Sequence, residues 1–210
     1  LVSEIMLQQT QAGRVVPKYL EFLSTFPTAK ALSTAPLSDV LRLWSGLGYN
    51  RRAKYLHEAA KQLQSKQRWT LNDLEKCKGI GKNTAAAVMV YSQNTPLIFI
   101  ETNVRTVFIH HFSQNAESID DKEILPLIEE AVDKEHPRDF YYALMDYGTY
   151  LKKTFGNASR QSKHYTKQSQ FKGSLRQLRG QILRELSNSN MSEAKLVTVL
   201  SDNRVKDALA

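Results

Sequence analysis

Apolar residues recur at helical spacing along nearly the whole chain. In residues 1–24 the apolar positions are Leu1, Ile5, Leu7, Val15, Val16, Tyr19, Leu20 and Phe22. This periodicity predicts a helix and its successor. Further helices are predicted over residues 28–32, 37–44, 51–64, 83–92, 103–112, 123–134, 139–153, 175–186, 192–200 and from 203 onward, with a short one opened by Thr70. The pattern therefore indicates helices almost throughout.

A glycine turn, KGIGK at residues 78–82, separates the short helix after Thr70 from the next one. Two glycines let the backbone approach a ligand closely, and their amides, with the N-terminus of the following helix, could receive a phosphate. Both Gly79 and Gly81 are expected to be needed for this conformation, while Lys76, Lys78 and Lys82 would add positive charge. The alternative interpretation is an ordinary corner between two helices.

A second Gly-x-Gly turn lies in WSGLGYNRR, residues 44–52. It carries Tyr49 at its tip and Arg51 and Arg52 at the start of the next helix. An aromatic ring beside cations on such a loop fits a wedge inserted into a duplex. The alternative is that Tyr49 packs beneath its own loop.

Two carboxylates stand out by their position. Glu4 lies in an otherwise apolar helical segment, and Glu101 follows the apolar run LIFI at residues 97–100. A carboxylate beside buried residues is a candidate for a shifted pKa and for proton transfer, although a solvated helix glutamate is the simpler interpretation of Glu4. The adjacent amides of Gln8 and Gln9 could read base edges or fill a gap in a base stack.

The charge of the chain favours a polyanionic partner. The 210 residues carry 29 Lys and Arg against 21 Asp and Glu, a net charge of +8. Nucleic acid is the first interpretation, an anionic membrane surface the second, and a merely basic surface the third. The one cysteine, Cys77, excludes an internal disulfide and a four-cysteine metal site, and it indicates a reducing compartment. No apolar run is long enough to cross a membrane.

The ends of the chain differ from its middle. It starts at Leu1 without a methionine and stops abruptly at Ala210, which suggests a fragment of a longer protein. The polar and basic segment 157–174 is predicted to be a linker or an arm against phosphates. The three short helices predicted over 175–210 either begin a winged-helix module or cover the main core.

Four segments, SEIMLQQTQ, LWSGLGYNRRAKYLH, KGIGKNTAAAV and IETNVRTV, resemble in order and separation the helix-hairpin-helix DNA glycosylase superfamily. They are most similar to the MutY-type adenine glycosylases, which excise adenine paired with 8-oxoguanine. The resemblance covers about residues 1–152 and implies an all-α fold of two helical lobes with DNA between them. A basic linker over 153–174 and a helical extension over 175–210 would follow. A monomer that binds mispaired double-stranded DNA in the bacterial cytoplasm, without a membrane partner, is also implied.

The resemblance assigns roles by position. Glu4 would protonate the flipped adenine, Glu101 would stabilise the positively charged sugar, and Asn103 would hydrogen-bond beside it. The expected DNA contacts are Gln8, Gln9, Tyr49, Arg51, Lys78, Gly79, Ile80, Gly81, Lys82, Asn83 and Thr84. The hairpin could hold a monovalent cation on its carbonyls, and no other metal or cofactor is expected.

Three departures from the family pattern matter. The family has aspartate where this chain has Glu101, and a carboxylate displaced by about an ångström can cost on the order of a hundredfold in rate. Asn83 stands where bifunctional relatives carry a Schiff-base lysine, so hydrolysis without a lyase step is expected. Lys152 stands where the first cluster cysteine would fall, so no iron–sulfur cluster is expected.

Three functions stay open at this point. The first is an adenine glycosylase acting opposite 8-oxoguanine or guanine. The second is a glycosylase for mismatched thymine or uracil, against which Glu4 and the two glutamines argue. The third is a lesion-binding DNA-binding protein without catalysis.

Overall fold

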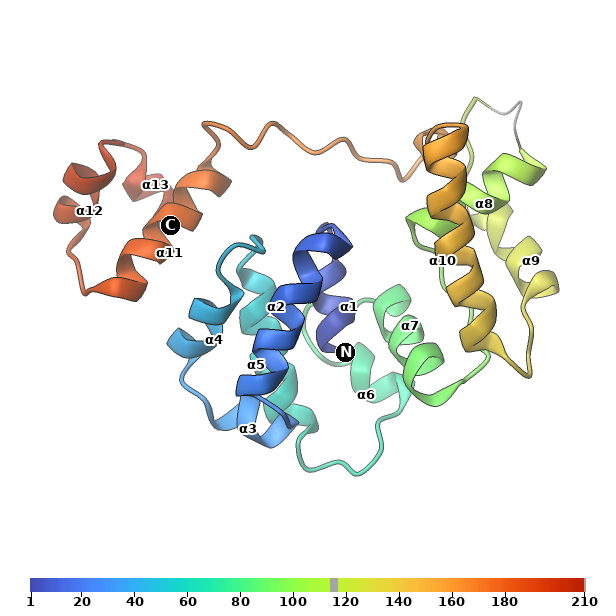
Figure 1. Ribbon diagram of the computed structural model, residues 1–210, viewed down its shortest axis with the longest axis horizontal. Helices are drawn as coiled ribbons and strands as arrows, with labels where there is room; N and C mark the ends of the chain where they lie inside the picture. Colours follow the sequence, from blue (N-terminus) through green and yellow to red (C-terminus); the bar gives the residue numbers. More distant parts are fainter. Residues whose placement is uncertain (114–116, 210) are drawn as a thin grey trace. The chain divides into compact units, whose positions relative to one another are not determined.

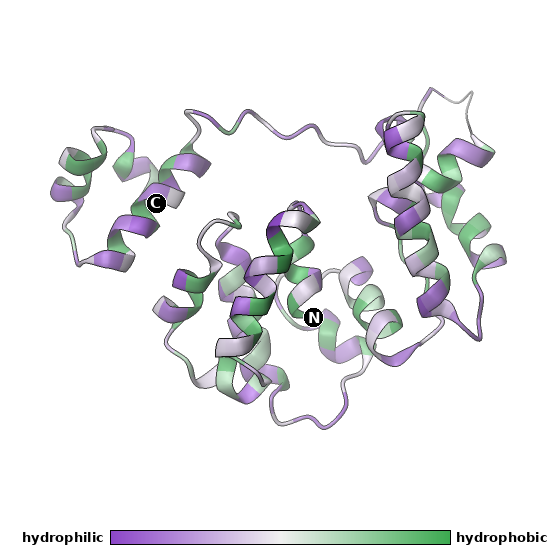
Figure 2. Ribbon diagram, viewed as in Figure 1, coloured by the Kyte–Doolittle hydropathy of each residue, from purple (hydrophilic) through white to green (hydrophobic). Residues whose placement is uncertain are grey.

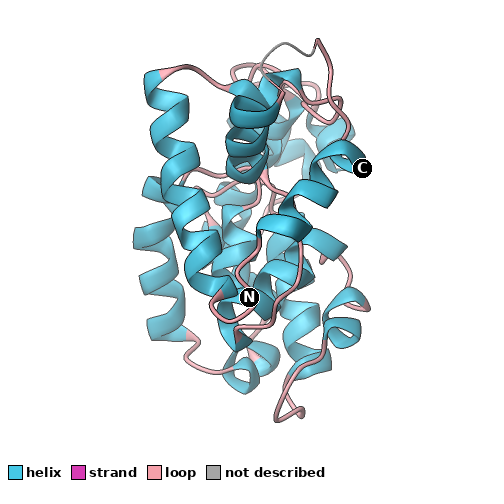
Figure 3. Ribbon diagram, turned by 90° about the vertical axis from the view of Figure 1, so that its right-hand side faces the viewer, coloured by secondary structure: helices cyan, strands magenta, loops and turns pink. Residues whose placement is uncertain are grey.

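The computed structural model describes residues 1–113 and 117–209. These residues form helices joined by loops, with no strand (Figure 3). The described helices are α1 (Val2–Leu7), α2 (Ala12–Thr25), α3 (Ala29–Thr34), α4 (Leu37–Trp44), α5 (Arg51–Leu63), α6 (Leu71–Glu75), α7 (Lys82–Gln93), α8 (Thr102–Phe112), α9 (Asp121–Ala131), α10 (Pro137–Thr154), α11 (Leu175–Asn188), α12 (Glu193–Leu200) and α13 (Val205–Leu209), with a 3₁₀ helix η1 (Ala158–Gln161). The prediction of an all-α fold is confirmed.

Helix boundaries follow local capping chemistry. The helix predicted over 123–134 begins earlier, because Asp120 and Glu123 exchange side-chain-to-backbone hydrogen bonds in a capping box. It ends at Ala131, before the extended Val132. Thr70 and Asp73 cap α6 in the same reciprocal way, with Thr70 N donating to Asp73 at 3.0 Å and Asp73 N donating to Thr70 at 3.2 Å.

The chain folds as two compact units, each assembled from separate stretches of sequence. The first unit comprises Leu1–Trp69, Lys76–Gly79 and Gln168–Ala210, and the second comprises Thr70–Glu75 and Ile80–Lys167. The hairpin at residues 78–82 therefore supplies residues to both units.

In the first unit, α3 and α4 pack against α5, and α1 packs against α2 and α5 (Figure 1). The apolar faces of these helices, green in Figure 2, form its core. Trp44 and Phe22 are fully buried there, with ring centroids 6.2 Å apart in an edge-to-face contact. This core holds α1 and the start of α5, which carry several of the candidate residues.

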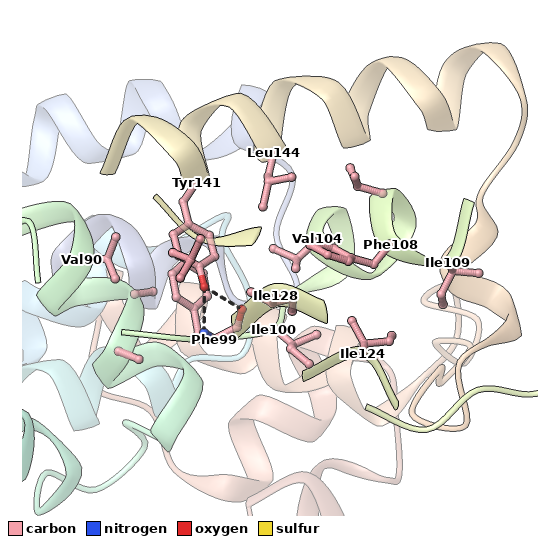
Figure 4. Packing of buried hydrophobic residues seen from close by; sticks show 14 of the residues in the cluster. Val90, Phe99, Ile100, Val104, Phe108, Ile109, Ile124, Ile128, Tyr141 and Leu144 are labelled. Carbon is pink, nitrogen blue, oxygen red and sulfur yellow. Dashed lines mark hydrogen bonds between the residues drawn. The ribbon is translucent and has the colours of Figure 1, made fainter. Parts of the chain in front are cut away.

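In the second unit, α10 packs against α8, and a buried tyrosine anchors the extended chain that enters α8 (Figure 4). The Tyr141 ring stacks on Phe99 with centroids 4.0 Å apart. Its hydroxyl accepts a hydrogen bond from Phe99 N at 3.1 Å and donates to Phe99 O at 3.5 Å. Burial raises the pKa of Tyr141, so its hydroxyl keeps its proton. Glu101 comes two residues after Phe99 and is the N-cap residue of α8. By holding Phe99, Tyr141 therefore helps to position Glu101.

The segment predicted as a linker over 157–174 is folded in its first part. Asn157 caps η1 by accepting from Ser159 N at 3.2 Å, and η1 packs on α8. Ile119 N then donates to Gln161 O, and Lys163 N to Ile119 O, each at 2.9 Å. No helix or strand covers residues 162–174, between η1 and α11.

Helices α11, α12 and α13 share a small apolar cluster of their own. Its buried members are Leu178, Ile182, Leu196, Val205 and Ala208. The side chains of Ser174 and Ser192 cap α11 and α12. Up to residue 209 this extension contains no strand. None of the described helices combines the length and apolarity needed to span a membrane.

Candidate functional site

The side chain of Arg52 is buried, with 8% of the residue exposed, and it donates hydrogen bonds to the carbonyl groups at the C-terminus of α1. Its Nη1 donates to the carbonyl oxygens of Ile5 and Met6, each at 2.9 Å, and to that of Gln8 at 2.5 Å. The last carbonyls of a helix have no partner within it, and the guanidinium supplies the missing donors. Glu4 is half-buried on this helix, so Arg52 fixes the segment that carries it.

The same guanidinium holds the first glycine turn. Its Nη2 donates to the carbonyls of Leu47 at 3.3 Å and Gly48 at 2.9 Å, and Nε donates to that of Tyr49 at 3.4 Å. The group also lies 5.4 Å from the centroid of the Trp44 ring. Burial lowers the pKa of Arg52 to about 10, which leaves it charged at neutral pH. Arg51, the predicted DNA contact, is exposed instead.

Gln9 and Tyr49, two predicted DNA contacts, both have a left-handed backbone, with φ of 54° and 48°. Residues with a Cβ adopt this conformation at a cost of roughly 1 kcal/mol, which is tolerated most often at functional positions. Tyr49 is half-buried, and its hydroxyl accepts a hydrogen bond from Arg176 Nη1 at 2.5 Å. Gln9 and Tyr49 line the same cavity, so the structure brings these two candidates together.

The two glycines of the hairpin have different reasons to be glycine. Gly79 has a φ of 83°, and a Cβ at this position would lie 2.3 Å from the Tyr55 ring. Gly81 has an ordinary extended backbone, with φ −81° and ψ 170°, and nothing lies within 4 Å of a Cβ built there. The prediction that both glycines are needed for the backbone conformation is therefore wrong for Gly81. Lys78 lies against the same ring, with Nζ 5.4 Å from the Tyr55 centroid.

The hairpin leads into the uncapped N-terminus of α7. Gly81 is its N-cap residue and offers no side chain to the first N–H groups of the helix. Such amides, with the helix dipole, are suited to receive an anion. Lys82 and Asn83 are exposed there, and Thr84 is half-buried, whereas Ile80 is buried in the turn.

Two further contacts orient the hairpin residues. Within the first unit, Gln8 Nε2 lies 3.5 Å from Gly79 O. Within the second, Asn83 Nδ2 donates to Ile100 O at 2.9 Å. Asn83, which stands where the resemblance places the Schiff-base lysine of bifunctional relatives, thus connects α7 to the residue directly before Glu101.

Glu101 is the N-cap residue of α8. Its Oε1 accepts hydrogen bonds from the backbone N–H groups of Asn103 at 2.5 Å and Val104 at 3.1 Å. Burial raises the pKa of Glu101, while these two N–H groups, Lys152 and Arg105 lower it in part. Aspartate is the usual acidic N-cap. Here the longer glutamate folds back so that Oε1 occupies the capping position.

The amide of Asn103 is incompletely satisfied. Its Nδ2 lies 3.5 Å from Met145 Sδ, and its Oδ1 is buried with no hydrogen-bond partner among the described residues. An unpaired buried acceptor costs about 1–3 kcal/mol and calls for an explanation. A Cβ at Gly148 of α10 would come within 2.7 Å of Asn103. This close approach explains a glycine inside a helix, a requirement that no local sequence pattern marks.

The described residues contain no group of three or more His, Cys, Asp or Glu side chains placed to hold a metal ion. Cys77, the single cysteine, is buried, and its Sγ lies 3.4 Å from Gln62 Oε1. The donor set of a four-thiolate cluster is therefore missing from this chain.

Residues 2–134 match the family model for the HhH-GPD superfamily of base excision DNA repair proteins. The chain is 36% identical over 158 residues to an adenine DNA glycosylase of Buchnera aphidicola subsp. Baizongia pistaciae, which covers 71% of this chain and 44% of that protein. It is 35% identical over 158 residues to an adenine DNA glycosylase of Mycobacterium tuberculosis, covering 70% of this chain and 51% of that protein. The chain thus spans about half the length of the curated relatives it matches.

Among solved structures, a thermostable thymine-DNA glycosylase has a similar fold. The two superpose with a TM-score of 0.62 at 23% sequence identity, over 76% of this chain and 77% of the other. This likeness concerns the arrangement of the helices, and the chemistry has to be argued from the residues.

Proposed function

The chain belongs to the HhH-GPD superfamily of base excision DNA repair proteins, as its motifs predicted, and on this premise we propose that it is a monofunctional adenine DNA glycosylase. Its substrate would be adenine mispaired with 8-oxoguanine or guanine in double-stranded DNA, bound by a monomer. The observation that carries the proposal is the capped, half-buried carboxylate of Glu101 beside the unpaired Oδ1 of Asn103. The names of the similar proteins support adenine as the base.

The reaction is a hydrolysis. The bond between C1′ of the deoxyribose and the adenine nitrogen breaks, and its electron pair leaves with the base, which Glu4 protonates. Positive charge develops on the sugar, and the ionised Glu101 stabilises it. A water molecule adds its oxygen to C1′ and releases a proton to the solvent, from which Glu4 regains the proton that it gave to the base. The products are free adenine and an abasic site.

A lyase step is not part of the proposal. Such a step needs an amine that attacks C1′, whereas Asn83 has an amide, whose Nδ2 donates a hydrogen bond to Ile100 O. Lys82 is exposed one residue earlier, about 100° around the helix. We also propose that no iron–sulfur cluster is required, because one cysteine cannot supply four thiolates. A monovalent cation held by the hairpin carbonyls would add to the binding of the DNA backbone.

The test is release of free base from duplexes of defined mispair. We expect adenine release opposite 8-oxoguanine and guanine, with an intact abasic strand until alkali cleaves it. Release of thymine or uracil opposite guanine instead would favour the second function. Tight binding to the duplex with no release of any base would show a lesion-binding protein and contradict the proposal.

Glu101 provides the sharper measurement. In Glu101→Gln, which keeps a capping oxygen but loses the charge, the single-turnover rate should fall by at least about a hundredfold. In the unchanged protein the rate should fall as the pH is lowered, because protonation removes the carboxylate. Since burial raises the pKa of Glu101, this fall should begin at a higher pH than for an exposed glutamate. A Glu101→Gln rate equal to that of the unchanged protein would rule out this role.

A further inference from the structure

A cavity of about 450 Å³ lies in the first unit, between the first glycine turn and α11. One wall carries Gln9, Arg14 and Tyr49, and the other carries Arg176 and Arg184. The described lining contains three arginines and neither Asp nor Glu. A chain with 21 acidic residues thus leaves this concave surface purely cationic, which favours an anionic ligand.

Arg176 joins the two walls. Its guanidinium lies 5.2 Å from the centroid of the Tyr49 ring and 5.5 Å from that of the Phe171 ring. It donates from Nη1 to the Tyr49 hydroxyl at 2.5 Å and from Nη2 to Ser169 O at 3.1 Å. A guanidinium carries five N–H groups, so donors remain for a ligand. Held between two rings, the group would lose little conformational entropy on binding.

The other two arginines differ in how they are held. Arg14 donates from Nη2 to the carbonyl of Gly46 in the turn. Arg184 is exposed at the cavity wall, two turns along α11 from Arg176. Planar guanidinium groups match the geometry of phosphate oxygens. The volume is too large for a single ion, and the amides of Gln177 and Gln181 line it beside the charges.

We infer that this cavity binds a nucleotide of a DNA strand, with its phosphodiester on Arg14, Arg176 and Arg184. Helix α11 lies outside residues 2–134, the part that matches the family model. The C-terminal extension would therefore be a DNA-contact element rather than a cover for the core. The inference rests on DNA as the partner in the proposed function, but it does not depend on base excision.

The test uses the full chain and an undamaged DNA duplex, with binding measured over a range of salt concentrations. Arg184→Gln should weaken binding about threefold to tenfold, and it should lower the slope of log K against log salt by about 0.9, the value for one phosphate contact. Lys195→Gln is the matched control, because it removes the same charge from the exposed surface of α12 in the same extension. An Arg184→Gln slope equal to that of the control would overturn the inference.

Arg176→Gln distinguishes a contact from a cover. If α11 binds DNA, this variant should also lose affinity. If α11 instead masks Tyr49 from DNA, affinity should rise, and the inference would be wrong. Deoxyadenosine monophosphate is the second probe. Binding of this free nucleotide that depends on Arg184 and is as tight as that of the duplex would assign the cavity to free nucleotides and overturn the DNA assignment.

Base release is measured in parallel on the mispaired duplex. Adenine release combined with equal slopes for Arg184→Gln and Lys195→Gln would reject the cavity and keep the proposed function. A reduced Arg184→Gln slope without release of any base would reject the proposed function and keep the cavity as a DNA site.

Discussion

The two Gly-x-Gly turns look alike in sequence but are stabilised in different ways. In the first turn Gly46 and Gly48 both have positive φ, 94° and 73°, with open space where a Cβ would lie. In the hairpin only Gly79 has positive φ, and the Tyr55 ring leaves it no room. The first turn is held by hydrogen bonds to its carbonyls, and the second by side-chain packing. The same spacing of glycines therefore serves two different physical requirements.

The largest expected effect comes from the side chain that holds the first turn. Arg52→Met should lower the free energy of unfolding by about 3 kcal/mol or more, because buried carbonyls of α1 and of residues 47–49 lose their donors. Urea denaturation measures this. Arg51→Met, next along the chain and exposed, is the control and should be nearly neutral. Equal losses in the two variants would contradict this role of Arg52.

Gly79→Ala should be the next most damaging change. The strain of a left-handed alanine and the clash with Tyr55 together should cost about 2–3 kcal/mol. Gly48→Ala carries the strain without the clash and should cost only about 1 kcal/mol. A Tyr55→Ala background should bring the Gly79→Ala cost down to that of Gly48→Ala. If the background changes nothing, packing against Tyr55 is not what requires glycine in the hairpin.

The sequence predicted the helices well because periodicity and capping are local. The helix predicted over 37–44 matches α4, and the helix predicted over 192–200 matches α12 with Ser192 as its cap. Arg52 could not be assigned in this way. Its partners at residues 5–10 are more than 40 positions earlier in the chain. No local pattern marks an arginine that will hydrogen-bond to several distant carbonyl oxygens.

The candidate site shows the same limit. Glu101 is visible in sequence as a carboxylate after an apolar run, but the buried, unpaired Oδ1 of Asn103 depends on packing against Met145 and Gly148 of α10. The contact of Tyr49 with Arg176 joins residues 127 positions apart. Motifs therefore indicated which residues matter, and tertiary packing determined what each of them contacts.

The smallest effect on stability, at Gly81, is the most informative about function. Gly81→Ser should raise the free energy of unfolding slightly, by about 0.3 kcal/mol, because serine is a good N-cap and its Cβ meets open space. The new hydroxyl would accept hydrogen bonds from the first N–H groups of α7. These are the N–H groups that would otherwise donate to a phosphate. DNA affinity should therefore fall by about tenfold, roughly 1.4 kcal/mol, while the free energy of unfolding is kept or rises. At Gly79 stability and affinity should fall together. Unchanged DNA affinity in Gly81→Ser would show that the hairpin is only a structural turn between two helices. The phosphate contact would then have to lie elsewhere.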